Sequence, residues 1–133
     1  MSSQGLKKNP RVIIIQKLYS KNLNSDGEIE FPKHRFKKFI KDIVLGSLER
    51  KELIDETIKL HLSEDIDFKR TEKLIIILLQ AAIFELLYKP ETSVNIIINE
   101  YLNAAKAFID NKQKNFLNAL LDKISRKLRT SNE

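Results

Sequence analysis

The most restrictive feature of the sequence is an apolar run from Leu74 to Tyr88, in which Gln80 and Glu85 are the only polar residues. As a helix its fifteen residues would measure about 22 Å, whereas a span across a bilayer needs about 30 Å. Lysines bracket the run at both ends. We therefore expect this segment to be the central buried helix of the fold rather than a membrane span.

The rest of the sequence is typical of an all-α chain. It is 42% hydrophobic and 32% charged with only three Gly and three Pro, which argues against a turn-rich β-sandwich. Apolar residues recur at helical spacing in every long segment. We predict six or seven helices and no strands, over about residues 9–21, 32–48, 49–61, 74–88, 93–110 and 115–129. The polar stretch 63–65 is the one candidate boundary inside the chain.

Individual residues refine these predictions. Asn9 and Pro10 form a good helix start, since Asn can cap free backbone N–H groups and Pro fits the first helical position. Pro32 is predicted to open the second helix, with Phe36 on its inner face, and Phe116 is predicted to lie on the inner face of the last helix. Gly46 lies inside the second helix, where Gly is unfavourable, so we expect another helix to approach closely there.

The positive charge is concentrated at one end of the chain. Residues 1–41 contain ten Lys or Arg and three Asp or Glu, a balance of +7, whereas residues 42–133 contain fourteen and fifteen, a balance of −1. A cluster of this kind can neutralise phosphates. The alternative is a chain that is simply rich in Lys, but that explains the number of lysines and not their crowding in the first third.

No catalytic or metal-binding constellation is visible in the sequence. Cys is absent, and His34 and His61 have no partner at metal-ligand spacing. The three glycines cannot form a phosphate-binding loop, and no nucleophile has a base beside it. We therefore expect no enzyme activity, no metal and no cofactor. The first residues lack the pattern of a signal peptide, so a cytoplasmic protein is expected.

Four segments of the sequence resemble motifs of one known protein family. The sequence QKLYS at residues 16–20 is similar to the family's QALYS-type signature, and AIFELL at 82–87 resembles its A-x-Y-E-L-L stretch. INEY at 98–101 followed by AAKAF at 104–108 is similar to the INE…AK-x-F segment. FLNALLDK at 116–123 resembles FVNGVLDK. The four matches have the order and spacing of the NusB family of transcription antitermination factors, and together the resemblance extends over about residues 10–128.

The resemblance implies a fold of two three-helix bundles, here an N-terminal bundle of about residues 9–62 and a C-terminal bundle of about 68–129. It also implies a non-enzymatic factor that pairs with the ribosomal protein NusE. The pair would bind single-stranded boxA RNA of ribosomal RNA operons, within an RNA polymerase antitermination complex that includes NusA and NusG. A NusB-like module joined to an RNA methyltransferase is disfavoured, because the chain ends at Glu133.

The resemblance also suggests residues for the two surfaces. The start of the first helix, where the RNA contacts are expected, contains fewer Arg residues than is usual for the family. We therefore expect RNA binding to depend more on the partner protein. Exposed carboxylates are expected to face the basic partner. The candidate RNA-binding residues are Lys7, Lys8, Arg11, Tyr19, Lys33, Arg35, Lys37 and Lys38, the last four only if the second helix lies alongside. The candidate partner-binding residues are Tyr19, Glu85 and Asp122.

Two other functions are compatible with the sequence. One is a protein-only helical adaptor with a NusB-like fold, in which the basic charge has no RNA to bind. The other is a protein that lies on a membrane surface, but the cations do not lie on a helix with a free apolar face. A specific, salt-sensitive affinity for RNA separates the first alternative from an antitermination factor.

Overall fold

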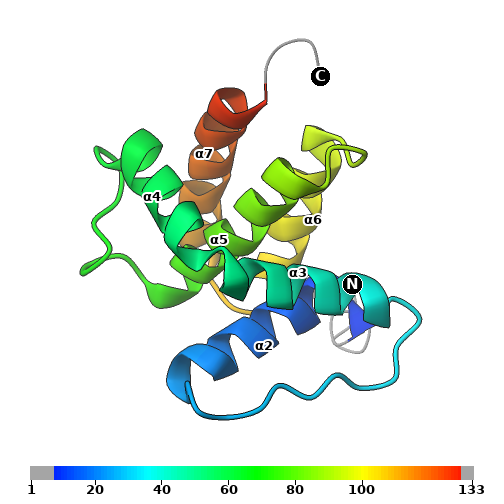
Figure 1. Ribbon diagram of the computed structural model, residues 1–133. Coiled ribbons are helices and arrows are strands. Elements are labelled where there is room, and N and C mark those ends of the chain that lie inside the picture. The colour runs from blue at the N-terminus through cyan, green and yellow to red at the C-terminus, as the bar shows by residue number, and fades with distance from the viewer. Residues whose placement is uncertain (1–7, 130–133) are drawn as a thin grey trace.

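The computed structural model describes residues 8–129, which form six α-helices and no strands (Figure 1). The prediction of an all-α fold is therefore confirmed. The helices are α2 (Pro10–Leu23), α3 (Lys37–Glu49), α4 (Lys51–Leu62), α5 (Lys73–Tyr88), α6 (Val94–Ala105) and α7 (Asn111–Leu128).

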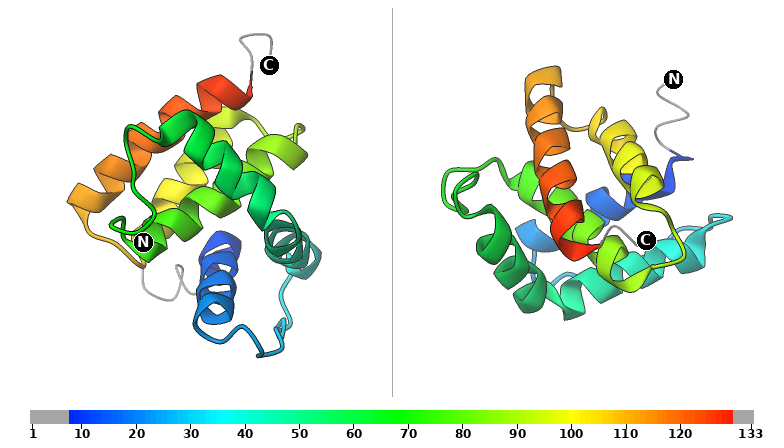
Figure 2. Two further views of the ribbon diagram at one scale, coloured as in Figure 1. Left: turned by 60° about the vertical axis from the view of Figure 1, so that its left-hand side comes forward. Right: turned by 90° about the horizontal axis from the view of Figure 1, so that it is seen from above.

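Helix α5 is the centre of the molecule, as its apolar sequence predicts. It packs against each of the other five helices, which surround it in the two views of Figure 2. Eleven of its sixteen residues are buried. At its C-terminal end the guanidinium of Arg129 donates hydrogen bonds to the carbonyl oxygens of Leu86 and Lys89, at 3.0 and 2.9 Å. These bonds satisfy carbonyl groups that have no partner inside the helix.

None of the helices between residues 8 and 129 has both the length and the apolar character of a membrane-spanning helix. The apolar core is instead shared among all six helices. It continues across the predicted boundary at residues 63–65, where Leu62 and Ile66 are both buried in it. An ion pair between Lys123 on α7 and Asp65, 2.8 Å apart, joins this connection to the C-terminal helix.

Helices α2 and α3 lie side by side and start at the same end of the molecule (Figure 1). The connection between them returns along the whole length of α2, so the two helices run in the same direction. Helix α3 begins at Lys37 and not at Pro32 as predicted. Residues 27–34 have no regular secondary structure, and the side chains of Ile29 and Phe31 pack against the core from this extended segment.

The close approach predicted at Gly46 is confirmed. A Cβ atom at this position would collide with the ring of Phe84 on α5. That ring is itself buried and packs on Tyr88, with ring centroids 4.9 Å apart. Gly46 therefore lets α3 lie directly against an aromatic side chain of the central helix.

Candidate nucleic-acid interface

His34 joins the segment before α3 to the start of α2. Its Nε2 atom lies 2.8 Å from the carbonyl oxygen of Lys8, and its Nδ1 atom accepts a hydrogen bond from the backbone N–H of Phe36 at 2.9 Å. Because Nδ1 is an acceptor here, the proton of the neutral ring belongs on Nε2, where it is donated to Lys8. One imidazole thus holds together two basic segments that are 26 residues apart in the sequence.

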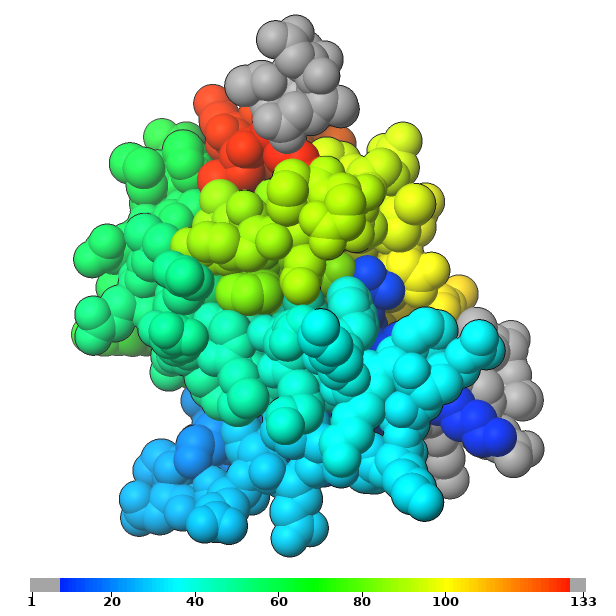
Figure 3. Space-filling view, turned by 45° about the vertical axis from the view of Figure 1, so that its right-hand side comes forward, coloured from blue at the N-terminus to red at the C-terminus, as the bar shows by residue number. Residues whose placement is uncertain are grey.

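This connection brings together five cations that we call the basic cluster: Lys8, Lys33, Arg35, Lys37 and Lys38. All five are exposed, and no ion pair involves any of them within the described residues. Figure 3 shows the cyan atoms of this segment next to the dark blue start of α2, with the yellow atoms of α6 beyond. Lys37 and Lys38 lie on α3, which packs beside α2, whereas Lys33 and Arg35 precede that helix. Lys7, a further candidate, lies outside the described residues.

The N-terminal ends of two helices add to the positive potential of this face. Helices α2 and α3 both begin here, and a helix carries partial positive charge at its N-terminus. Asn9 caps α2 by accepting hydrogen bonds from the backbone N–H groups of Arg11 and Val12, at 2.8 and 3.3 Å. No side chain caps α3, but its first N–H group, that of Lys37, donates to the carbonyl oxygen of His34 at 3.1 Å, so only the following N–H groups of the first turn remain for an anion.

Arg11 and Glu85 form a buried ion pair instead of two surface groups. Arg11 Nε and Nη2 donate to the two carboxylate oxygens of Glu85, at 2.9 and 2.7 Å. Glu85 is 0% exposed and Arg11 is 8% exposed. Burial lowers the pKa of Arg11, but the hydrogen bonds and charge of Glu85 outweigh this effect and raise the pKa above its ordinary value. The guanidinium therefore stays charged.

The expectation that Glu85 is an exposed carboxylate is thus wrong. Glu85 lies on the central helix, where a carboxylate must find a cation or lose its charge. Arg11 provides that cation, so its guanidinium points into the protein and away from a phosphate outside. The ring of Tyr101 also lies near the guanidinium, with its centroid 5.4 Å from the Arg11 Cζ atom.

Phe36 is a surface residue that the sequence places wrongly on an inner face. It is 45% exposed. Its ring lies 5.1 Å from the guanidinium carbon of Arg35 and 5.9 Å from the ring of His34. Together with Pro10, Arg11, Phe39 and Glu100 it lines an open hollow of about 360 Å³. Helical periodicity could not find this site, because Phe36 precedes the first residue of α3.

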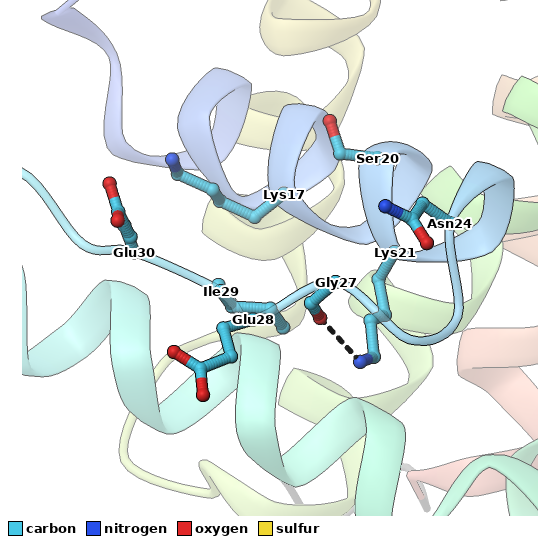
Figure 4. Close-up of a pocket in the computed structure, with 8 residues that line it drawn as sticks. All are labelled: Lys17, Ser20, Lys21, Asn24, Gly27, Glu28, Ile29 and Glu30. Atoms are coloured by element: carbon cyan, nitrogen blue, oxygen red, sulfur yellow. Dashed lines mark hydrogen bonds between the residues drawn. The ribbon is translucent and has the colours of Figure 1, made fainter.

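A second hollow, with a volume of about 290 Å³, lies between the C-terminal half of α2 and the returning segment (Figure 4). Helix α2 contributes Lys17 and Lys21 to it, and the returning segment contributes Glu28 and Glu30. Lys21 donates a hydrogen bond to the carbonyl oxygen of Gly27 at 2.8 Å and so fastens that segment to the helix. The charges of the two cations and two anions that line this hollow cancel, which makes the hollow a poor site for a polyanion.

The remaining candidate residues lie apart from the basic cluster. Tyr19 is half-buried and packs against the core. Asp122 is exposed on α7, where it forms an ion pair with Arg126 at 2.7 Å. Within the described residues, no three His, Asp or Glu side chains are arranged to hold a metal ion.

The fold and this face define a small all-α protein with a concentrated positive surface at the paired starts of two helices. The chain belongs to the NusB family, whose model matches residues 8–126. The resemblance seen in the sequence is confirmed.

Curated relatives carry the name "transcription antitermination protein NusB". The one from Caulobacter vibrioides is 28% identical over 90% of this chain and 91% of its own length. The one from Sphingopyxis alaskensis is 34% identical over 68% of this chain and 61% of its own length. The match with the Lysinibacillus sphaericus protein is 37% identical and includes 65% of this chain and 68% of that protein. The chain spans 59% of the Mesorhizobium japonicum relative.

Proposed function

We propose that the chain is an RNA-binding antitermination factor that binds single-stranded boxA RNA of ribosomal RNA operons together with the ribosomal protein NusE. The complex would act on RNA polymerase with NusA and NusG. The observation that carries the RNA part is the His34 hydrogen bond to Lys8, because it gathers the basic cluster beside the uncapped start of α3. Exposed cations without acidic partners are free to neutralise phosphates and release counterions.

The RNA-binding residues in this proposal are the basic cluster and Lys7, with Tyr19 at a base or at the edge of the partner. Arg11 acts indirectly: it donates its hydrogen bonds to Glu85 and supports the interface from inside the protein. Lysines predominate in the cluster, and Lys binds phosphate as a point charge without the two-pronged geometry of Arg. The affinity for RNA alone is therefore modest, and NusE strengthens it.

The NusE surface includes Asp122 and Tyr19. Asp122 presents an exposed carboxylate on α7, which suits a basic ribosomal protein. Glu85 has no exposed surface and serves the partner only by fixing Arg11 and α2.

The test is a gel-shift titration of boxA RNA and a scrambled RNA, with and without NusE. A specific shift that NusE strengthens supports the proposal. Lys37→Ala with Lys38→Ala lowers the salt slope of binding by about 0.7 for each lysine removed. The matched control, Lys112→Ala with Lys127→Ala on exposed positions of α7, leaves the slope unchanged. Equal shifts with both RNAs and no effect of NusE contradict the proposal.

The partner surface has its own test by calorimetric titration with NusE. Asp122→Lys weakens binding without unfolding the chain, whereas Glu91→Lys, a charge reversal on an exposed loop residue, leaves it unchanged. Unchanged affinity for Asp122→Lys removes this residue from the interface.

A helical adaptor is the second candidate, and α4 is the observation that favours it. Leu53 and Leu60 are 46% and 76% exposed, two turns apart on one face. Glu52 and Glu56 are exposed beside them. An apolar stripe with acidic flanks suits a basic protein partner. If RNA binding proves non-specific, Leu60→Glu would be the first variant to test against candidate protein partners.

A further inference from the structure

The hollow beside the basic cluster combines one exposed aromatic ring with one exposed carboxylate. Its volume of about 360 Å³ lies at the lower end of the roughly 300–1,000 Å³ typical of small-ligand pockets. Phe36 and Phe39 come from the start of α3, Pro10 and Arg11 from the start of α2, and Glu100 from α6. A planar group about as large as one nucleobase fits this space better than a larger ligand.

Phe36 provides the surface on which a base can stack. Its ring is exposed among cations instead of covered by apolar neighbours, and the Arg35 guanidinium lies over it. Proteins bind unpaired bases by stacking them on aromatic rings beside a positively charged track for the backbone. Here the track is adjacent, since Lys37, Lys38 and Lys41 line a further hollow of about 470 Å³ on the same helix, with Asp42 as its one carboxylate.

Glu100 determines which base fits. An ionised carboxylate has two acceptor oxygens and no donor. Guanine is the RNA base whose pairing edge offers two adjacent donors, N1–H and the 2-amino group. Adenine and cytosine place an acceptor beside their amino group, and uracil flanks its single N–H with two carbonyl oxygens. Arg11 Nη1 lies 4.0 Å from Glu100 Oε2, which helps to hold the carboxylate beside the hollow.

We propose that this hollow binds one unstacked guanine of single-stranded RNA, with Phe36 stacking on the base and Glu100 accepting hydrogen bonds from its N1–H and 2-amino groups. The inference rests on the proposed function, because the basic cluster must hold the RNA backbone. It goes further in assigning base specificity to two residues that carry no positive charge.

The experiment is a fluorescence-anisotropy titration of the full chain with short oligouridines that carry uridine, guanosine, inosine or adenosine at one central position. The guanosine oligonucleotide should bind about tenfold more tightly than the uridine one. Inosine keeps N1–H but lacks the 2-amino group, so it should lose most of this gain. Glu100→Gln should abolish the difference between guanosine and inosine, because the amide has one acceptor oxygen instead of two.

Phe36 is tested separately by its loss and its conservative replacement. Phe36→Ala should weaken binding of the guanosine oligonucleotide by about tenfold, and Phe36→Tyr should retain it. Phe116→Ala on α7, at 38% exposure, and Glu91→Gln are the matched controls and should change nothing. Thermal melts of all variants establish that each is folded, which is expected because Phe36 and Glu100 are both accessible to solvent.

The outcomes separate this inference from the proposed function. Equal, salt-sensitive affinity for all four oligonucleotides, unaffected by Glu100→Gln, overturns the guanine site and leaves RNA binding intact. A preference for guanosine that persists in both Phe36→Ala and Glu100→Gln places the specificity elsewhere and also overturns it. Absence of salt-sensitive binding to any RNA overturns both.

Discussion

Glu85 places a carboxylate where water does not reach it, and Arg11 is the only cation that approaches it with two hydrogen bonds among the described residues. Removing one member of such a pair leaves an uncompensated buried charge, which destabilises a protein by about 3–5 kcal/mol. We therefore predict that Glu85→Ala and Arg11→Ala each lower the free energy of unfolding by that amount. Urea denaturation followed by circular dichroism measures it.

The double variant separates the charge effect from lost packing. Arg11→Met with Glu85→Leu should be more stable than Arg11→Met alone or Glu85→Leu alone, because no charge remains unpaired. Glu100→Ala is the control, since its carboxylate is 45% exposed and lies on the outer side of the same guanidinium. Single-variant losses that simply add in the double variant would contradict a coupled pair.

The hydroxyl group of Tyr101 is buried, and within residues 8–129 it makes no hydrogen bond of ordinary geometry, although Glu85 and Arg11 lie close to it. Burial, followed by the negative charge of Glu85, raises the pKa of Tyr101 well above its ordinary value of 10.0. Above the ordinary pKa of 10.0, the tyrosine of the unfolded chain loses a proton that the folded chain keeps. The free energy of unfolding therefore falls as pH rises. We predict that Tyr101→Phe is at least as stable as the parent at neutral pH and loses less stability in alkali.

Denaturation at neutral pH and at several alkaline values tests this prediction for Tyr101. Tyr88→Phe is the comparison, since Tyr88 is half-buried. A loss of more than about 1 kcal/mol in Tyr101→Phe at neutral pH would mean that the hydroxyl makes a net favourable hydrogen bond.

The contact between α3 and α5 depends on the missing side chain of Gly46. Ala is better than Gly in a helix by about 1 kcal/mol, but here its methyl group would enter the ring of Phe84. Overpacking of this kind typically costs about 1–3 kcal/mol, and the buried ring has little room to move. We predict that Gly46→Ala lowers the melting temperature and that Phe84→Leu restores part of the loss.

Gly27→Ala is the control for Gly46→Ala. A Cβ atom there would meet mainly the exposed side chain of Asn24, which can turn away. Gly27 has no positive φ angle, so the backbone accepts Ala. A Gly46→Ala protein as stable as the parent would show that α3 can shift away from α5.

The helical structure of the long segments could be predicted from the sequence because it follows from local periodicity. The central position of α5 could be predicted because it follows from one long apolar run. Helix starts were harder. The Asp110 and Gln113 capping box begins α7 at Asn111, four residues before the predicted start. Pro32 does not start α3, because His34 holds the following residues to Lys8 through a tertiary hydrogen bond that no local pattern reveals.

The candidate site was predictable in charge but not in geometry. The excess of cations in the first third of the sequence correctly indicated a basic surface, and α3 lies beside α2 as that surface requires. The sequence could not show that Arg11 is paired with a carboxylate 74 residues away. Phe36 and Glu100 were missed for the same reason, since they meet only where three helices converge.

At the scale of the whole molecule, charge and topology act together. The returning segment between α2 and α3 makes these helices parallel, so their positive ends point the same way and coincide with the basic cluster. An antiparallel pair would place one positive and one negative end at this face and weaken its potential. The exposed carboxylates of α4, Glu52 and Glu56, lie on another helix and do not belong to this face.

The continuous core predicts how the chain unfolds. Helix α5 buries residues against both α2–α4 and α6–α7, so neither half can keep its apolar surface covered when the other is lost. We predict a single cooperative transition in urea, with the same midpoint by circular dichroism and by tyrosine fluorescence. Hydrogen exchange should give Ile58 on α4 and Leu121 on α7, both fully buried, the same free energy of opening. Two separate midpoints, or a much lower protection of Ile58, would mean that the bundles at about 9–62 and 68–129 unfold as independent units.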